Sequence, residues 1–164
     1  MFLLFTAVFL PFIKATAAPY YVATNGSDAA SGASWDQALA TISNAVAKAT
    51  TPGDVIWVSN GIHSITAQIT INHAITLRSL NGRQATVIRR QGPAQHRILQ
   101  CTNSSAVIHG FTIMNGHSGS ASGGGVYMTG GTIHDCTIIS NTTVTGANAY
   151  GGGGIWLAAP GPSV

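Results

Sequence analysis

The fold is decided by residues 107–113, VIHGFTI, which return in similar form as residues 132–138, TIHDCTI. Isoleucine, histidine, threonine and isoleucine recur in place, and Cys136 takes the position of Phe111. A second pair of similar segments is residues 123–128 (GGGVYM) and 152–157 (GGGIWL), and its offset is slightly longer than that of the first pair. The two offsets differ, so a loop varies in length while the repeated segments keep their order. This behaviour is typical of a solenoid, in which insertions collect in loops and the stacked core is unchanged.

Short runs rich in β-branched residues, separated by Gly, Asn and Ser, follow residue 54. They are residues 55–58, 69–71, 75–77, 86–88, 97–100, 106–108, 111–113, 125–128, 132–133, 136–139 and 154–157. Three short strands per repeat predict a parallel β-helix, in which equivalent side chains of successive coils lie about 4.8 Å apart. We expect Ile113 above Ile138 on the inside and Thr112 above Thr137 on the outside. An antiparallel sandwich also has short strands, but it does not require a fixed repeat.

Residues 18–53 are predicted to form an N-terminal strand and a capping helix. The strand is expected at residues 20–23, and the helix at about four turns. Ser34 and Gln37 have the spacing of a capping box at its start, and Pro52 and Gly53 end it. Its apolar stripe is expected to cover the end of the solenoid. Residues 54–164 are predicted to form the coils, about three complete ones and the start of another. The predicted fold is therefore an all-β parallel solenoid, incomplete at its C-terminal end.

Residues 1–17 are predicted to be a signal peptide. The apolar run at residues 2–13 is shorter than the roughly 20 residues that a membrane span needs. Ala15 and Ala17 supply the small residues of a cleavage site. A buried core segment is the alternative interpretation. We expect a secreted or cell-surface protein with no membrane span in the mature chain. Cys101 and Cys136 fall on different walls of the repeat, so we expect two separate buried thiols.

The composition excludes several kinds of active site. The chain has four acidic residues, all aspartates, and a formal net charge of +3. Glycoside hydrolysis by two carboxylates and calcium-dependent elimination both need grouped carboxylates, yet only Asp135 lies among the repeats. No catalytic residue is assigned, and no cofactor is expected. The basic residues occupy too short a stretch to favour a nucleic-acid partner.

The basic residues form one cluster in the sequence, which is the candidate contact for an anionic polysaccharide. Arginine guanidinium groups suit carboxylates and sulfates. The alternative is that these side chains only cover the solvated face of the second coil. The candidate contact residues are Arg78, Arg89, Arg90, His96 and Arg97, with Arg83 nearby.

Two other groups of side chains have the composition of binding sites. His109 and His134 occupy equivalent places on adjacent coils and could share a metal ion. Two ligands without a third do not make a site, so no metal site is assigned. Tyr127, Tyr150 and Trp156 could stack on sugars, but inward packing of Tyr127 and Trp156 is equally compatible with their repeat positions.

Several segments together resemble exported right-handed parallel β-helix proteins of the pectate-lyase-like superfold. The N-terminal and first-coil segments are residues 21–28 (YVATNGSD), 40–42 (ATI), 52–58 (PGDVIWV) and 75–82 (ITLRSLNG). Residues 110–116 (GFTIMNG) with 123–127 (GGGVY) resemble the Gly-rich repeat of large surface proteins in that group. The resemblance implies a right-handed helix and an extracellular protein. It implies no single activity, because the group contains polysaccharide lyases, glycoside hydrolases and adhesin-like proteins.

Three functional hypotheses follow. The first is a non-catalytic surface or adhesin-like protein that contacts glycans. The second is the N-terminal part of a polysaccharide lyase or glycoside hydrolase whose catalytic coils lie elsewhere. The third is a nonfunctional fragment, whose last coil would leave an unpaired strand edge open to self-association.

Overall fold

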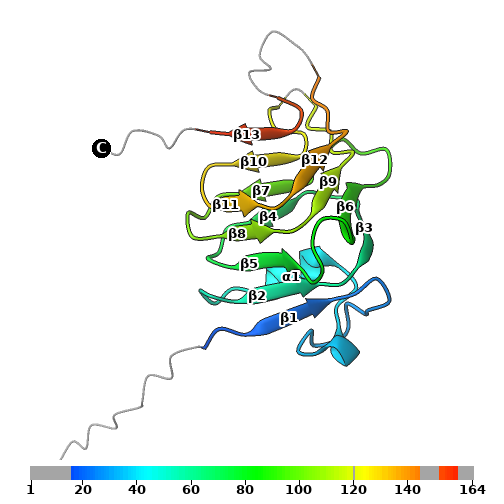
Figure 1. The fold of residues 1–164 in the computed structure, drawn as a ribbon, viewed down its shortest axis with the longest axis vertical. Helices are drawn as coiled ribbons and strands as arrows, with labels where there is room; N and C mark the ends of the chain where they lie inside the picture. Colours follow the sequence, from blue (N-terminus) through cyan, green and yellow to red (C-terminus); the bar gives the residue numbers. More distant parts are fainter. Residues whose placement is uncertain (1–15, 120, 145–151, 159–164) are drawn as a thin grey trace, which may run out of the picture.

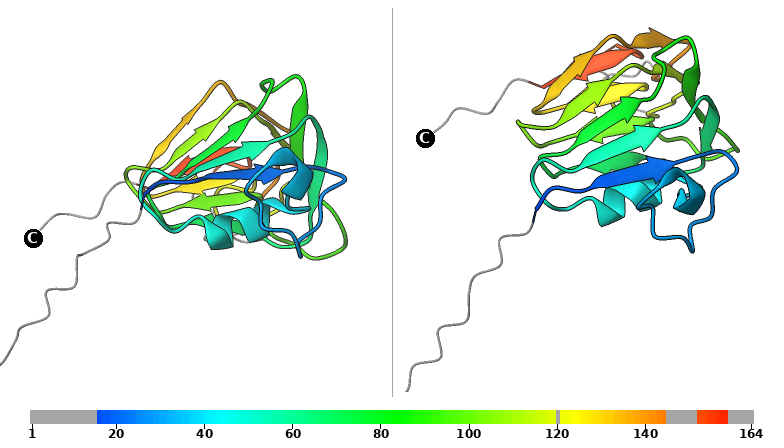
Figure 2. Two further views of the ribbon diagram at one scale, coloured as in Figure 1. Left: turned by 90° about the horizontal axis from the view of Figure 1, so that it is seen from below. Right: turned by 60° about the horizontal axis from the view of Figure 1, so that its bottom comes forward.

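The computed structural model describes residues 16–119, 121–144 and 152–158, which wind into a right-handed parallel β-helix of four coils (Figure 1). Each coil gives one strand to each of three sheets, which enclose a triangular section when seen from below (Figure 2). The first two coils contain β2 (Val55–Val58), β3 (Gly61–Ile65), β4 (Ile69–Ile71), β5 (Thr76–Ser79), β6 (Thr86–Arg90) and β7 (Leu99–Cys101). The last two contain β8 (Val107–His109), β9 (Thr112–Met114), β10 (Val126–Met128), β11 (Thr132–His134), β12 (Thr137–Ile139) and β13 (Ile155–Leu157). The predicted parallel solenoid is confirmed, with four sets of three strands where about three complete coils were expected.

The three sheets have strict parallel register. Sheet A has the order β1-β2-β5-β8-β11, sheet B the order β12-β9-β6-β3, and sheet C the order β13-β10-β7-β4. Ile113 pairs with Ile138 in sheet B, and Val126 pairs with Ile155 in sheet C. Both offsets seen in the sequence are therefore the lengths of single coils. The antiparallel sandwich is excluded, because every strand pair in the described part of the chain runs parallel.

The core fills the inside of the triangle with stacked apolar side chains. Phe111, Ile108 and Ile113 are completely buried. The backbone N–H of Phe111 donates to the Sγ of Cys136, 3.4 Å away, so these two residues are neighbours on adjacent coils as predicted. Cys101 is buried and Cys136 half-buried, and both are free thiols, which confirms that they do not pair. Burying an aliphatic or aromatic side chain of this size stabilises the fold by about 1.5–3 kcal/mol.

Strand β3 was not predicted from the sequence, because a histidine interrupts its apolar pattern. His63 lies in the inward row of sheet B, paired with Ile88, and is 6% exposed. Its Nε2 donates to the carbonyl oxygen of Ser59, 3.0 Å away. Burial lowers the pKa of His63, because a charged imidazolium in this environment would lose its hydration.

We predict that His63 makes the fold sensitive to acid. Since its pKa is lower in the folded chain than in the unfolded chain, its neutral form favours folding at pH values above about 6.5, the usual histidine pKa. That stability is lost as the pH falls below this value towards the folded pKa. The urea midpoint of wild type should therefore fall between pH 7.5 and pH 5, and the fall should be smaller in His63→Ile. The partly exposed His73 supplies the control, because His73→Gln should keep the wild-type fall; an unchanged fall in His63→Ile would contradict the assignment.

The N-terminal residues cover one end of the solenoid, with a shorter helix than predicted. Strand β1 (Pro19–Val22) adds to sheet A beside β2, and helix α1 (Ile42–Lys48) packs against β1, β2 and β4 (Figures 1 and 2). The four-turn helix is wrong: residues Trp35–Gln37 form a separate 3-10 turn, and α1 is confined to Ile42–Lys48. The side chain of Ser34 makes no capping bond, and Thr41 is the N-cap instead, accepting from the Asn44 N–H at 3.2 Å.

Pairing with β1 explains why the helix starts late. Leu39 forms a parallel bridge with Val22, and its N–H donates to the Tyr21 carbonyl at 2.8 Å. The Asp28 carboxylate accepts from the backbone N–H groups of Ala40 and Thr41, both at 3.0 Å. These contacts hold this segment extended, so tertiary pairing outweighs its helical periodicity.

Some predictions concern residues outside the described part of the chain. They are the signal peptide, nearly all of whose residues are excluded, Tyr150, and the last residues from 159 onwards. Within the described part, no helix combines the length and apolar character needed to cross a membrane.

Candidate functional site

The five basic residues that the sequence grouped together lie on three different sheets. Arg78 is on β5 of sheet A, whereas Arg89 and Arg90 are on β6 of sheet B. His96 and Arg97 lie in the loop before β7 of sheet C. The structure therefore does not gather them on one face.

Two of these arginines donate hydrogen bonds to backbone carbonyl groups. Arg90 donates from Nε to Asn115 at 2.9 Å and from Nη1 to Gly92 and Ala94 at 2.8 and 3.0 Å. Arg97 donates from Nη2 to the Ser122 carbonyl at 3.2 Å. Both side chains hold loops between strands, a structural role that leaves them less free to bind an anion.

The side chains beside Arg97, Tyr127 and His96, also have structural roles. Its guanidinium carbon lies 4.7 Å from the centroid of the Tyr127 ring, which points outward between the buried Val126 and Met128. The inward packing considered for Tyr127 is therefore wrong. Burial lowers the pKa of Arg97, and the Nδ1 of His96 lies 2.8 Å from the Arg97 carbonyl oxygen.

The outward face of sheet A carries a continuous row of aromatic and basic side chains, which we call the sheet A row. Strand register places one member on each strand. The guanidinium carbon of Arg78 lies 4.3 Å from the centroid of the Trp57 ring, and the His109 and His134 rings stack with centroids 4.4 Å apart. The members of the row are Tyr21, Trp57, Arg78, His109 and His134.

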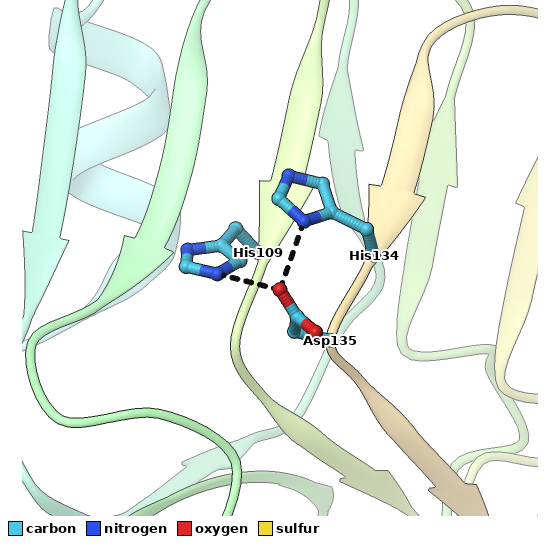
Figure 3. Close-up of side chains that lie close together, drawn as sticks. All are labelled: His109, His134 and Asp135. Atoms are coloured by element: carbon cyan, nitrogen blue, oxygen red, sulfur yellow. Dashed lines mark hydrogen bonds and ion pairs between the residues drawn. The ribbon is translucent and has the colours of Figure 1, made fainter.

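A compact group of side chains lies at one end of this row, at the corner after β11 (Figure 3). The Oδ2 of Asp135 lies 3.1 Å from the Nε2 of His109 and 3.1 Å from the Nδ1 of His134. The other carboxylate oxygen lies 3.9 Å from the Nη1 of Arg83. We call His109, His134 and Asp135 the corner cluster.

The corner cluster arises from the repeat together with one departure from it. Gly110 and Asp135 occupy the same corner on adjacent coils, with φ angles of +82° and +52°. This left-handed conformation favours glycine, and aspartate is among the few other residues that adopt it. The equivalent positions of the two histidines on adjacent coils were predicted correctly, but Asp135 was interpreted as an isolated carboxylate. The informative signal was that Asp135 follows His134 directly and replaces the glycine of the preceding coil.

The corner cluster carries a charged carboxylate and is open to solutes. Hydrogen bonds from His134 and His109 lower the pKa of Asp135, although partial desolvation opposes them. Side-chain exposure rises from 26% for His109 through 49% for His134 to 63% for Asp135. A hollow of about 330 Å³ borders the cluster and is lined by residues 81–84, His109, Gly110 and Asp135. The arrangement can bind a cation or orient a polar ligand, but it contains one carboxylate and not the pair used in glycoside hydrolysis.

The other described carboxylates near the coils have structural partners. Asp54 is buried and accepts from the backbone N–H groups of Ala18 and Thr51 at 2.8 and 2.9 Å. Asp28 holds the segment before α1, as described above.

Comparisons of the chain with protein-family models, with curated proteins and with solved structures found no match.

Proposed function

We propose that this chain is a non-catalytic protein that works outside the cell, secreted or at a cell surface, and contacts an anionic polysaccharide through the sheet A row. The observation that carries the proposal is the position of Arg78. It lies at the centre of the row, between Trp57 and His109. The pectate-lyase-like resemblance supports the extracellular, carbohydrate-related setting.

The shape of the row suits an extended polymer. Its five members lie on neighbouring strands, so they span about 19 Å along the solenoid axis at the usual strand spacing. None of the five strands of sheet A contains an acidic residue, and the carboxylate that contacts the row, Asp135, lies at its far end beside His109 and His134. A linear chain lying along the axis would meet aromatic edges at Tyr21 and Trp57 and a cation at Arg78.

Arg78 differs from Arg90 and Arg97 in its hydrogen bonds. Like Arg97, it has a buried Nε without a partner among the described residues and stacks on an aromatic ring. Unlike Arg90 and Arg97, it donates to no loop carbonyl in the described part of the chain. A carboxylate or sulfate group could pair with this guanidinium, the geometry for which arginine is best suited. We therefore propose Arg78, the one member of the basic cluster on sheet A, as the main contact, with Arg83 in the adjoining hollow.

Retention on immobilised polygalacturonate and dextran sulfate tests the proposal, with neutral dextran as the reference matrix. A hydrogen bond to a charged group contributes about 1.5–3 kcal/mol, so Arg78→Ser should weaken binding about tenfold to a hundredfold. Arg89→Ser is the matched control, because Arg89 is exposed on sheet B and carries the same charge.

The two variants separate a site from general charge attraction. Arg89→Ser should elute at nearly the same salt concentration as wild type. Arg78→Ser should elute at a much lower salt concentration. Equal losses in the two variants would show that net charge alone is responsible. Absence of wild-type retention on both acidic matrices would refute the contact with anionic glycans.

A further inference from the structure

We infer that the corner cluster of His109, His134 and Asp135 is a binding site for a divalent transition-metal ion, with Zn²⁺ as the best fit. The site shares His109 and His134 with the sheet A row, but the observations behind it do not depend on the proposed glycan contact. It rests on three donor groups that the β-helix brings together from two adjacent coils (Figure 3).

The donor atoms lie close to the spacing that a metal requires. Tetrahedral zinc with ligand distances of about 2.0–2.1 Å places its ligand atoms about 3.3 Å apart. Asp135 Oδ2 already lies 3.1 Å from a nitrogen of each histidine, and one ligand atom from each residue falls within 4.8 Å of the others. The remaining adjustment is to bring ligand atoms that lie up to 4.8 Å apart closer to one another, and both His134 and Asp135 are exposed enough to turn.

The kinds of donor select among metals. Two imidazoles and one carboxylate suit zinc, copper, nickel or iron, whereas calcium and magnesium prefer sites made of oxygen. Zinc needs no particular d-electron geometry and accepts three protein ligands with a further position open. The hollow lined by residues 81–84 adjoins the cluster beside His109 and Asp135, so a water or a small ligand can occupy that position.

The surroundings of the carboxylate also fit a ligand role. Arg83 lies 3.9 Å from Oδ1, which leaves Oδ2 directed at the two histidines. Charged groups in this outer position orient ligating carboxylates in metal sites. Each imidazole nitrogen that faces Oδ2 now donates a hydrogen bond. It would present its lone pair to the metal once its proton had moved to the other ring nitrogen.

The site is tested by titrating the chelator-stripped chain with Zn²⁺ in a calorimeter, and with Co²⁺ while recording visible absorption. Wild type should bind one equivalent of Zn²⁺, and Co²⁺ should give the strong absorption of a tetrahedral complex. His134→Ala should weaken Zn²⁺ binding at least about a hundredfold, since loss of an outer-shell group alone costs about tenfold to a hundredfold.

Asp135→Gly removes a ligand without disturbing the fold, so a loss of metal binding in this variant cannot be explained by unfolding. Glycine is the residue at the equivalent corner of the preceding coil, and it adopts the positive φ of this position without strain. This variant should remain folded and still lose the Co²⁺ absorption. Asp135→Asn should also lose most Zn²⁺ affinity, although its side-chain oxygen can accept the same hydrogen bonds from the histidines.

Two controls address other metal-binding side chains. His73→Ala removes a histidine outside the cluster, and Cys136→Ser removes the thiol that follows Asp135 directly. Both should bind Zn²⁺ as wild type does. The inference is overturned if wild type takes up no stoichiometric Zn²⁺, if His73→Ala or Cys136→Ser weakens binding as much as His134→Ala, or if folded Asp135→Gly keeps the wild-type Co²⁺ spectrum.

Discussion

Alanine at position 124 is expected to destabilise the last two coils by more than about 3 kcal/mol, because overpacking already costs about 1–3 kcal/mol where side chains can move aside. A Cβ atom at Gly124 would collide with the carbonyl oxygen of Thr142 and lie 2.8 Å from that of Gly153. Here the obstacles are backbone atoms of the neighbouring coil, which cannot turn away without separating the coils. The effect is measured as a fall in the urea midpoint of Gly124→Ala.

Gly152→Ala is the matched control, because Gly152 belongs to the equivalent Gly-rich run one coil later. Among the described residues, a Cβ atom there would meet only the carbonyl oxygen of Ile155, at 3.9 Å. Its effect should stay within about 1 kcal/mol, as for glycine-to-alanine changes that the backbone tolerates. Limited proteolysis should cut Gly124→Ala in its last two coils while Gly152→Ala stays resistant. Equal urea midpoints for the two variants would show that the runs do not pack as closely as the structure indicates.

The stacking register could be predicted from sequence because adjacent coils must match in shape. Ile113 lies against Ile138 and Thr112 against Thr137, so the same residue types return at one-coil intervals. The sequence pattern gave wrong predictions where the local preference of a segment differed from the pairing that the fold imposes on it. His63 hid strand β3 because a polar residue occupies an inward position, and Leu39 fits helical spacing although it pairs with Val22.

The candidate site was less predictable, because a solenoid separates sequence neighbours and joins distant residues. Arg90 and Arg97 are close in the chain, but Arg90 ends β6 of sheet B and Arg97 lies beyond the corner, in the loop before β7 of sheet C. Arg78 and His109 lie much farther apart in sequence and are direct neighbours on sheet A. Asp135 joins the corner cluster from a position with positive φ. Aspartate permits this backbone conformation but does not require it, so the sequence alone does not predict it.

Removing the side chain of Ile113 tests the layered core itself. Ile113→Ala should reduce the free energy of unfolding by about 2–5 kcal/mol, the range for truncating a buried aliphatic side chain. Ile113 is completely buried in the middle of sheet B, between Ile88 and Ile138 of the neighbouring coils. Its loss therefore leaves a cavity that weakens contacts on both sides.

Ile62→Ala separates burial from strand propensity. Ile62 lies on β3 of the same sheet but is 52% exposed, so the change in propensity is the same while little apolar surface is lost. We expect a reduction below about 1 kcal/mol, consistent with surface substitutions that leave no cavity. Urea denaturation followed by circular dichroism gives both values from one protocol. If the two variants lose similar stability, Ile113 does not face a packed interior, and the stacking of coils cannot be what holds this chain together.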